Sequence, residues 1–517
     1  MRSMLLLLAA LTAASAFAQT SEVIEVHLLE VEASVVDRAG KPVENLEQKD
    51  FDVTIDGKAA DISNFYLVRR GEIVEEPQSG AASAPQAAPE KVPSRIAFFI
   101  DDVHLHERTK KRALDAVIKY VESLDPSASV MLVRWNGSLQ IALPATRDKS
   151  AILAAVRELA AQPARGRVSD TERRQIMDMY TSKIDEDEVR QHVLNYAETQ
   201  ASLARTTIAA LQDITRILGG FAGRRMLLYV SEGLPQFPGL ELTSVVEQNI
   251  PGQVLSLDQT RNIQRLNAYA QASGVVFCPF DPSGPDGMRY AVETGGGRVD
   301  VMRTNARPTA ELMARETGGQ LIADTNDLDT ALAVLDRGVT TYYSLGVPAP
   351  EGKRGPFNIA VRVKNHPDLR VVTAARRGVT TRAQEVAAAV QSHLYLREEV
   401  NPLGVKVKMG EARKDGQRCI VPLMIALPSN RLTLLPAGDA EKGELSVHFA
   451  VADERQQESQ VKTTSKEVWP RKGSEVTELI ALSLQPKKYV VSIAVTDDIA
   501  GEASYVQREI DARGCMK

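Results

Sequence analysis

The sequence predicts an α/β protein, with a doubly wound, mostly parallel sheet flanked by an N-terminal small β domain and a C-terminal β-sandwich. Strand-like and helix-like segments alternate through the middle of the chain, as is typical of a parallel sheet with helices on both faces. The segments before this region are short and rich in β-branched residues. The final part returns to strand patterns without long helices, at the spacing of a sandwich.

The first residues have the pattern of a secretory signal peptide. Arg2 supplies a positive charge, an apolar run follows, and Ala16-Phe17-Ala18 provides a small-residue cleavage site. The apolar run is too short for a membrane-spanning helix. We therefore expect an exported chain, periplasmic or secreted, with no membrane span.

The residues after the signal peptide predict a small β domain followed by a linker. The segment Val23–Val68 is rich in β-branched residues, and Asp56-Gly57 predicts a hairpin turn. The next stretch, EEPQSGAASAPQAAPEKVPS, is dense in Pro, Ala, Ser and Gly and offers almost nothing to bury. This composition predicts a linker.

The central sheet is predicted to begin at Arg95. RIAFFI is a continuous apolar run, as expected of a strand covered on both faces. Asn136-Gly137 predicts a hairpin, so one strand should be antiparallel. GVVFCPF and TYYSLGV predict later strands of the same sheet. The expected ranges are 1–18 signal peptide, 19–70 small β domain, 71–94 linker, 95–347 central domain with a helical insertion at 163–195, 348–384 β extension, and 385–517 β-sandwich.

The charge balance argues against a nucleic-acid partner. The chain carries 62 Lys and Arg against 67 Asp and Glu, a net charge of −5. Removal of Arg2 with the signal peptide leaves 61 basic residues and a net charge of −6. Nucleic-acid phosphates require a basic surface.

The order of the motifs resembles a known family. The chain contains, in sequence, VVDRAGKPVENLEQKDFDVTIDGK, RIAFFIDDVHL, LLYVSEGL, GVVFCPFDPSG and TYYSLGVPAPEGKRGPFNIAVRVKNHPDLRVVTAARRGV. This order resembles the exported bacterial "VWFA-related" proteins, which carry a von Willebrand factor type A domain. The resemblance covers nearly the whole chain to about Val379, and the β-rich C-terminal part more loosely.

The resemblance implies a metal-ion-dependent adhesion site with the motif D-x-S-x-S and with a Thr and an Asp from later loops. No Thr of the polar insertion can be assigned to this motif. Asp101 matches the first Asp, and Glu232 stands where the later Asp is expected. Val103 and Leu105 occupy the two Ser positions, and neither side chain offers an oxygen. The expected site, with Asp102 as a further candidate ligand, is therefore degenerate. Any Mg²⁺ or other divalent cation should bind weakly.

Two other interpretations of the same stretch remain open. If the strand continued beyond Asp101, then Asp102, His104 and His106 would share one face, a set that suits Zn²⁺ or another transition metal. The polar residues could equally form a solvated rim of the sheet without any ligand.

The functional expectation is an exported protein-binding, adhesion or scaffolding protein, not an enzyme. Its partner would be another protein or a cell-surface polymer, bound where the central strands end. Asp281 follows VVFCPF at such a position, although it could also cap its own turn. The alternative function is a metal-dependent hydrolase that uses the cluster 101–106. The sequence leaves the oligomeric state open.

The three cysteines are too few for a disulfide framework. Cys419 begins one β-strand and Cys515 follows the last one, so both lie at the ends of the same predicted domain. Export places them in an oxidising compartment, which predicts a Cys419–Cys515 disulfide. Cys278 lies inside an apolar strand and is expected to remain a buried thiol.

Overall fold

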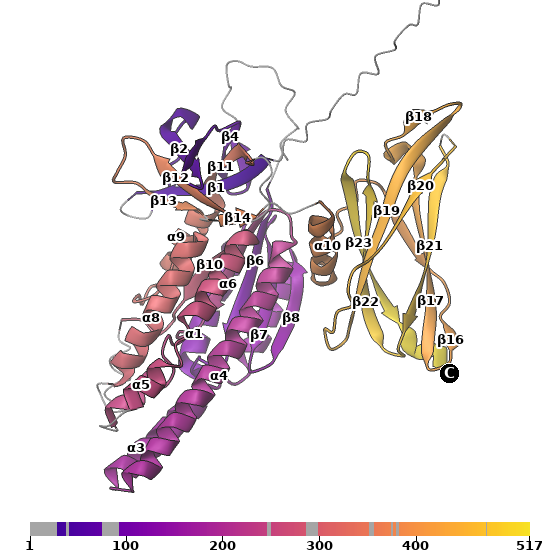
Figure 1. Ribbon diagram of the computed structural model, residues 1–517. Coiled ribbons are helices and arrows are strands. Elements are labelled where there is room, and N and C mark those ends of the chain that lie inside the picture. Colours follow the sequence, from indigo (N-terminus) through magenta and orange to yellow (C-terminus); the bar gives the residue numbers. More distant parts are fainter. Residues whose placement is uncertain are drawn as a thin grey trace, which may run out of the picture.

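The computed structural model describes residues 28–37, 41–74, 92–245, 250–285, 298–350, 356–373, 376–378, 382–471 and 473–516. It consists of an N-terminal β part, a central α/β domain and a C-terminal β-sandwich (Figure 1). The expected signal peptide and most of the expected linker lie outside the described residues. Within the described ranges, no helix combines the length and the apolar character needed to cross a membrane.

The central domain is built on a five-stranded sheet with the order β10-β9-β6-β7-β8. β8 runs antiparallel to β7, in agreement with the Asn136-Gly137 turn between them, and the other neighbouring pairs are parallel. The sheet confirms the predicted α/β class with a mostly parallel sheet. The strands are β6 (Ser94–Asp101), β7 (Ser129–Trp135), β8 (Leu139–Thr146), β9 (Arg224–Val230) and β10 (Val275–Phe280).

Helices cover both faces of this sheet, which explains why β6 is apolar without alternation. Phe98 and Phe99 are both fully buried, but they belong to cores on opposite faces. The Phe98 face is covered by α1 (Glu107–Ser123), α2 (Lys149–Ala160) and α9 (Leu328–Thr340). The Phe99 face is covered by α4 (Glu186–Gly219), α6 (Thr260–Ala272) and α8 (Arg298–Thr317).

The N-terminal β part combines strands from the chain segments before and after the central domain. Its sheets have the orders β13-β1-β11-β4-β5 and β14-β12-β2-β3. The strands before the central domain are β1 (Leu28–Val36), β2 (Phe51–Ile55), β3 (Lys58–Ala60), β4 (Asn64–Arg69) and β5 (Glu72–Val74). The strands after it are β11 (Thr341–Pro348), β12 (Pro356–Val363), β13 (Arg370–Thr373) and β14 (Arg376–Gly378). The central domain is therefore inserted between β5 and β11.

This insertion corrects the expected place of TYYSLGV. β11 pairs with β1 and β4, both antiparallel, and takes no position in the central sheet. Tyr343 and Leu345 complete the core of the N-terminal part together with Phe51. The prediction was wrong because β11 is buried along almost its whole length, so its apolar run resembles that of a central strand. The expected linker also began too early, since Glu72–Val74 forms β5.

The polar insertion is helical, as expected, and its two helices form a hairpin. α3 (Gly166–Thr181) leads through a short turn into α4, which continues to Gly219. The far half of α4 is part of the central core through Leu211 and Ile214. The near half packs on α3 and on the segments η2 (Leu240–Val245) and α5 (Ile250–Leu255). The hairpin extends away from the sheet (Figure 1).

The C-terminal part is a two-sheet β-sandwich. One sheet contains β15 (Lys406–Met409), β16 (Arg413–Asp415), β17 (Arg418–Pro428) and β21 (Glu475–Leu484). The other contains β18 (Leu435–Ala437), β19 (Ala440–Asp453), β20 (Lys462–Val468), β22 (Lys488–Asp497) and β23 (Glu502–Asp511). The alternating apolar residues of both sheets share one core.

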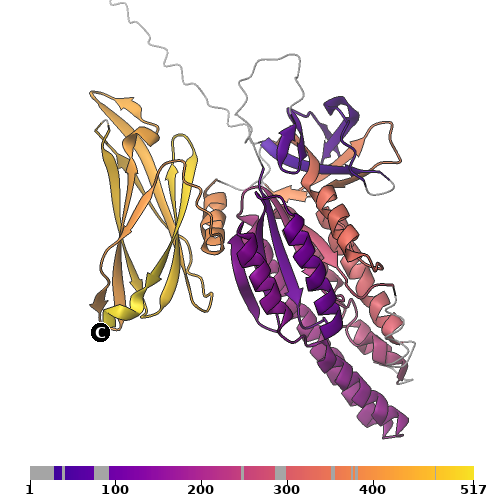
Figure 2. The same cartoon turned by 180° about the vertical axis from the view of Figure 1, so that it is seen from behind.

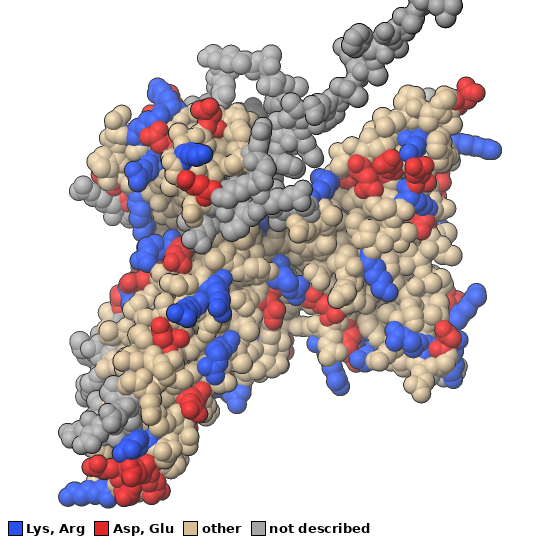
Figure 3. All heavy atoms as spheres, in the orientation of Figure 1, with Lys and Arg blue, Asp and Glu red and all other residues tan. Residues whose placement is uncertain are grey.

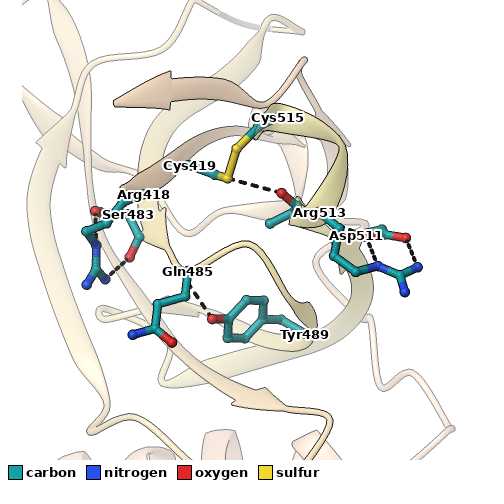
Figure 4. Close-up of a disulfide and its surroundings, with 9 residues drawn as sticks. Arg418, Cys419, Ser483, Gln485, Tyr489, Asp511, Arg513 and Cys515 are labelled. Carbon is teal, nitrogen blue, oxygen red and sulfur yellow. Dashed lines mark hydrogen bonds and ion pairs between the residues drawn. A yellow bond between two sulfur atoms is a disulfide. The ribbon is translucent and has the colours of Figure 1, made fainter. Parts of the chain in front are cut away.

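A disulfide joins Cys419 to Cys515, the pairing that the sequence predicted (Figure 4). Cys278 is a buried free thiol in β10. The bond ties the start of β17 to the turn after the last strand. Cys419 is fully buried in the sandwich core. The bridge closes a long loop and restrains the C-terminal end of the chain.

A helix that the sequence analysis did not predict lies between the central domain and the sandwich. This helix is α10 (Arg382–Ser392), and both views place it between the two parts (Figures 1 and 2). Val390 of α10, Ile214 of α4 and Ala450 of β19 belong to one continuous core. Across the same interface, Arg216 lies 2.9 Å from Glu458.

Candidate functional site

The structure places Asp101 and Glu232 at the same carboxyl edge of the central sheet. Asp101 is the last residue of β6, and Glu232 follows β9 after Ser231. β6 and β9 are parallel neighbours, with Ile100 opposite Val230. Parallel neighbours end at one edge, so the predicted proximity of these two carboxylates is confirmed.

The carboxylate of Asp101 is fully buried and surrounded by donors. Its Oδ1 accepts hydrogen bonds from the backbone N–H groups of Val103 and His104, at 3.2 and 3.3 Å. Its Oδ2 accepts from the hydroxyls of Tyr229 and Ser231, at 2.7 and 3.1 Å. The two hydroxyls come from β9 and its end, so the neighbouring strand holds the carboxylate in place.

The imidazole of His104 lies beside Asp101, whose carboxylate favours the charged form of the ring. His104 Nδ1 lies 2.7 Å from Asp101 Oδ2. Burial disfavours the charged imidazole, but the charge and hydrogen bond of Asp101, with the more distant charge of Glu232, outweigh it. The pKa of His104 therefore lies above its ordinary value. The Nε2 atom of His104 is buried and has no hydrogen-bond partner among the described residues.

A second imidazole, His106, lies between two carboxylates. His106 is the residue before α1, and its Nδ1 is 2.9 Å from Glu232 while its Nε2 is 2.7 Å from Asp170. Hydrogen bonds to Asp170 and then Glu232 raise the pKa of His106 to about 10. Burial works against ionisation of Asp170, but His106 and Arg173 lower its pKa below the ordinary value. Thr109 also donates to Glu232, so each carboxylate of this edge has a fixed donor.

Asp102 points elsewhere and contradicts the shifted-register interpretation. β6 ends at Asp101 and the chain turns, so Asp102, His104 and His106 do not share a strand face. The buried Asp102 carboxylate lies 2.7 Å from Lys110 Nζ and 2.5 Å from Arg134 Nε. Burial raises the pKa of Asp102 despite these two cations. This ionic triad is structural, because it joins β6, α1 and β7 inside the domain.

The residues present do not fit a magnesium site. Val103 and Leu105, at the two Ser positions of the motif, are buried and belong to the two apolar cores of the domain. Both oxygens of Asp101 already accept hydrogen bonds, and the imidazole of His104 lies 2.7 Å from Oδ2. Within the described ranges, no three His, Cys, Asp or Glu side chains converge in a way that could hold a metal ion.

Asp281 caps its own turn at the adjacent strand end. Its Oδ1 accepts from the backbone N–H and the hydroxyl of Ser283, at 2.9 and 2.6 Å. Asp281, Glu232 and Thr309 line a cavity of about 20 Å³, which is close to the space that a single water needs. This cavity is too small to enclose a substrate. The role of Asp281 in partner binding stays a prediction.

Sequence reasoning missed Asp170, Thr109, Tyr229 and Ser231 as parts of this edge. Tyr229 is a buried residue of β9, and the position of a tyrosine within an apolar strand does not show that its hydroxyl donates to Asp101. Asp170 lies in a polar helix whose position depends on tertiary contacts. Gly166, at the start of this helix, is the one related feature visible in the sequence. The structure explains the glycine, because a Cβ there would lie 2.7 Å from the carbonyl oxygen of Leu105. That close approach brings α3 against the loop after β6.

Comparisons with known proteins give fold likeness only. No protein-family model matches the chain, and no curated protein matches it. Among solved structures, proximal thread matrix protein 1 from the mussel byssus is similar over 48% of this chain and 48% of its own, with 12% identity and a TM-score of 0.26. This chain therefore spans about half the length of the mussel protein.

Two bacterial structures are similar over the same share of this chain. They are an aerotolerance-related membrane protein from Bacteroides fragilis, with 14% identity, 98% of its own length covered and a TM-score of 0.25, and BatB from Bacteroides thetaiotaomicron, with 13%, 97% and 0.25. These scores describe a partial likeness of fold and do not identify a family.

Proposed function

We propose that this chain is an exported protein-binding or adhesion protein that recognises another protein or a cell-surface polymer at the carboxyl edge of its central sheet. We further propose that this recognition needs no divalent cation, because two histidines provide the positive charge. The observation that carries the proposal is the 2.7 Å contact between His104 Nδ1 and Asp101 Oδ2. A type A-like site would use that aspartate for Mg²⁺.

Three features of the edge support surface recognition over catalysis. The cavity beside Glu232 has room for about one water. His106 and Glu232 remain partly accessible, with 34% and 22% of their side chains exposed. The pKa of His106 is raised to about 10, which favours a cation at this accessible position, and a cation attracts oxygen acceptors. The proposed partner therefore presents carboxylate, carbonyl or hydroxyl oxygens.

The hydrolase alternative finds less support. It requires Asp101, Asp102, His104 and His106 to face one metal ion. Instead, Asp102 pairs with Lys110, while the two imidazoles bind different carboxylates.

The test is affinity capture from the cell envelope of the source organism by the immobilised mature protein. We expect the same partner with excess EDTA and with millimolar Mg²⁺. Capture should be lost in His106→Ala, which removes the accessible imidazole of the edge, and unaffected in His192→Ala, which changes an exposed histidine on α4. Capture that requires Mg²⁺, capture that survives His106→Ala, or stoichiometric zinc in the purified protein would each overturn the proposal.

A further inference from the structure

The outer face of the C-terminal sandwich carries an exposed apolar strip. The strip lies on the β17–β21 ladder, where Met424 and Leu479 are directly opposite each other. Met424 is 39% exposed and Leu479 is 70% exposed, although both lie within long strands. We call this surface the outer strip. It is formed by Ile420, Pro422 and Met424 of β17 and by Leu479 and Ala481 of β21.

Positive charges border the outer strip. Lys408 lies opposite Met424, and Arg413 lies opposite Ile420, so both belong to the outward row of side chains. Neither forms an ion pair with a described residue. Lys406 is on the same row and pairs with Glu475 at 3.2 Å. An apolar surface with a cationic border suits a partner that presents apolar side chains next to carboxylates.

Such a surface exists on the same chain, at the turn between α3 and α4. Tyr180 is 44% exposed and Ile184 is 37% exposed at this turn. The following residues, Asp185, Glu186, Asp187 and Glu188, are exposed carboxylates. We call residues 178–188 the hairpin tip. Figure 3 shows the acidic side chains gathered at this end of the molecule.

We propose that the hairpin tip of one copy of this protein docks on the outer strip of the next copy. The tip and the β17–β21 ladder lie at opposite ends of the molecule in both views (Figures 1 and 2), so one chain cannot make this contact with itself. A contact between two different surfaces is heterologous, and it produces an open row of copies unless the rotation closes a ring. The proposal does not depend on the function proposed for the carboxyl edge.

The two surfaces have compatible dimensions. Two neighbouring strands are about 5 Å apart, and three outward positions along a strand cover about 14 Å. The end of a two-helix hairpin measures about 10 by 20 Å. A footprint of about 200 Å² on each partner is well below the roughly 800 Å² on each partner in a stable interface. Assembly should therefore be weak, concentration-dependent and sensitive to salt.

Sedimentation equilibrium of the full mature protein tests the proposal. We expect the mass of the wild type to rise above that of one copy as concentration increases, and to fall again at high salt. Ile184→Lys at the hairpin tip and Leu479→Glu on the outer strip should each give the mass of one copy. Leu435→Glu is the matched control, because it changes a leucine of the same sandwich that is 52% exposed and outside the strip.

Mixing the two interface variants separates this proposal from a symmetric dimer. Ile184→Lys keeps an intact strip and Leu479→Glu keeps an intact tip, so an equimolar mixture should form pairs and nothing larger. Thermal unfolding confirms that each variant is folded. The proposal is overturned if the wild type has the mass of one copy at every concentration, if either variant assembles alone, if Leu435→Glu prevents assembly, or if the mixture does not pair.

Discussion

Two histidines with little exposed surface, in different regions of the molecule, have opposite charge preferences. At the carboxyl edge, His104 contacts the carboxylate of Asp101, and its pKa is raised. At the interface beside α10, the Nδ1 of His393 donates to the carbonyl of Ala389 at 2.7 Å, and its ring stacks on Tyr505. Burial lowers the pKa of His393 to about 4. Burial alone favours a neutral imidazole, and a fixed carboxylate reverses that preference.

The largest expected effect concerns the buried charges at the carboxyl edge. Asp102→Ala should reduce the free energy of unfolding by about 3–5 kcal/mol, because Lys110 and Arg134 would remain buried without their carboxylate. Urea unfolding measures the change. Adding Lys110→Met should recover part of the loss, since it removes one of the orphaned charges. A loss below about 1 kcal/mol would show that water reaches the triad.

A smaller effect is expected at the α10 interface in acid. The folded-state pKa of His393, about 4, is below its ordinary value of 6.5, so the unfolded chain binds the proton first. Stability linked to this group is complete above pH 6.5 and is lost as pH falls towards 4, by at most about 3 kcal/mol.

His393→Phe keeps the ring but cannot titrate, so its unfolding free energy should depend less on pH between 4 and 6.5. Chemical unfolding of both proteins across this range is the measurement. Equal pH dependence in both proteins would mean that His393 accepts the proton within the folded interface.

The smallest effect is expected at the carboxyl edge in alkali. The pKa of His106 is raised from 6.5 to about 10, so its contribution is complete below pH 6.5 and is lost as pH rises towards 10. Because a third of the side chain is exposed, solvent screening should limit the loss to about 1–2 kcal/mol.

The comparison for this prediction is the wild type against His106→Gln, with His192→Gln as the control on an exposed histidine. The wild type and the control should lose stability between pH 7 and 9.5, while His106→Gln should lose less. If the unfolding free energies of all three proteins fell equally between pH 7 and 9.5, the charge of His106 would not contribute to stability.

The fold could be predicted best where the local sequence pattern of a strand or turn was sufficient to identify it. The apolar run at Arg95 predicted β6 and placed Asp101 at its end, and Asn136-Gly137 predicted the antiparallel β8. The sequence failed for β11, because a strand buried on both faces has the same pattern in either sheet. Helix α10 was not predicted because it is short and rich in Ala. Such a helix is marginal by itself and depends on packing against the two neighbouring domains.

The candidate site could be predicted only in part, for a related reason. Asp101 ends one strand and Glu232 follows another, so their position at a shared edge was predictable. The partner of each carboxylate was not, because His104 and His106 reach their targets only after the chain turns at Asp101. Asp170 lies more than sixty residues from His106 in sequence, and only the docking of α3 makes them neighbours.

The pairing of β1 with β11 has a consequence for how the chain matures. Leu28 lies opposite Pro348. β1 therefore cannot pair with β11 until the ribosome has synthesised the whole central domain. Such distant pairings slow folding. A nick in an exposed loop of the central domain would leave the two fragments clasped through this ladder. The N-terminal β part thus joins the two ends of the central domain by backbone hydrogen bonds as well as by the chain itself.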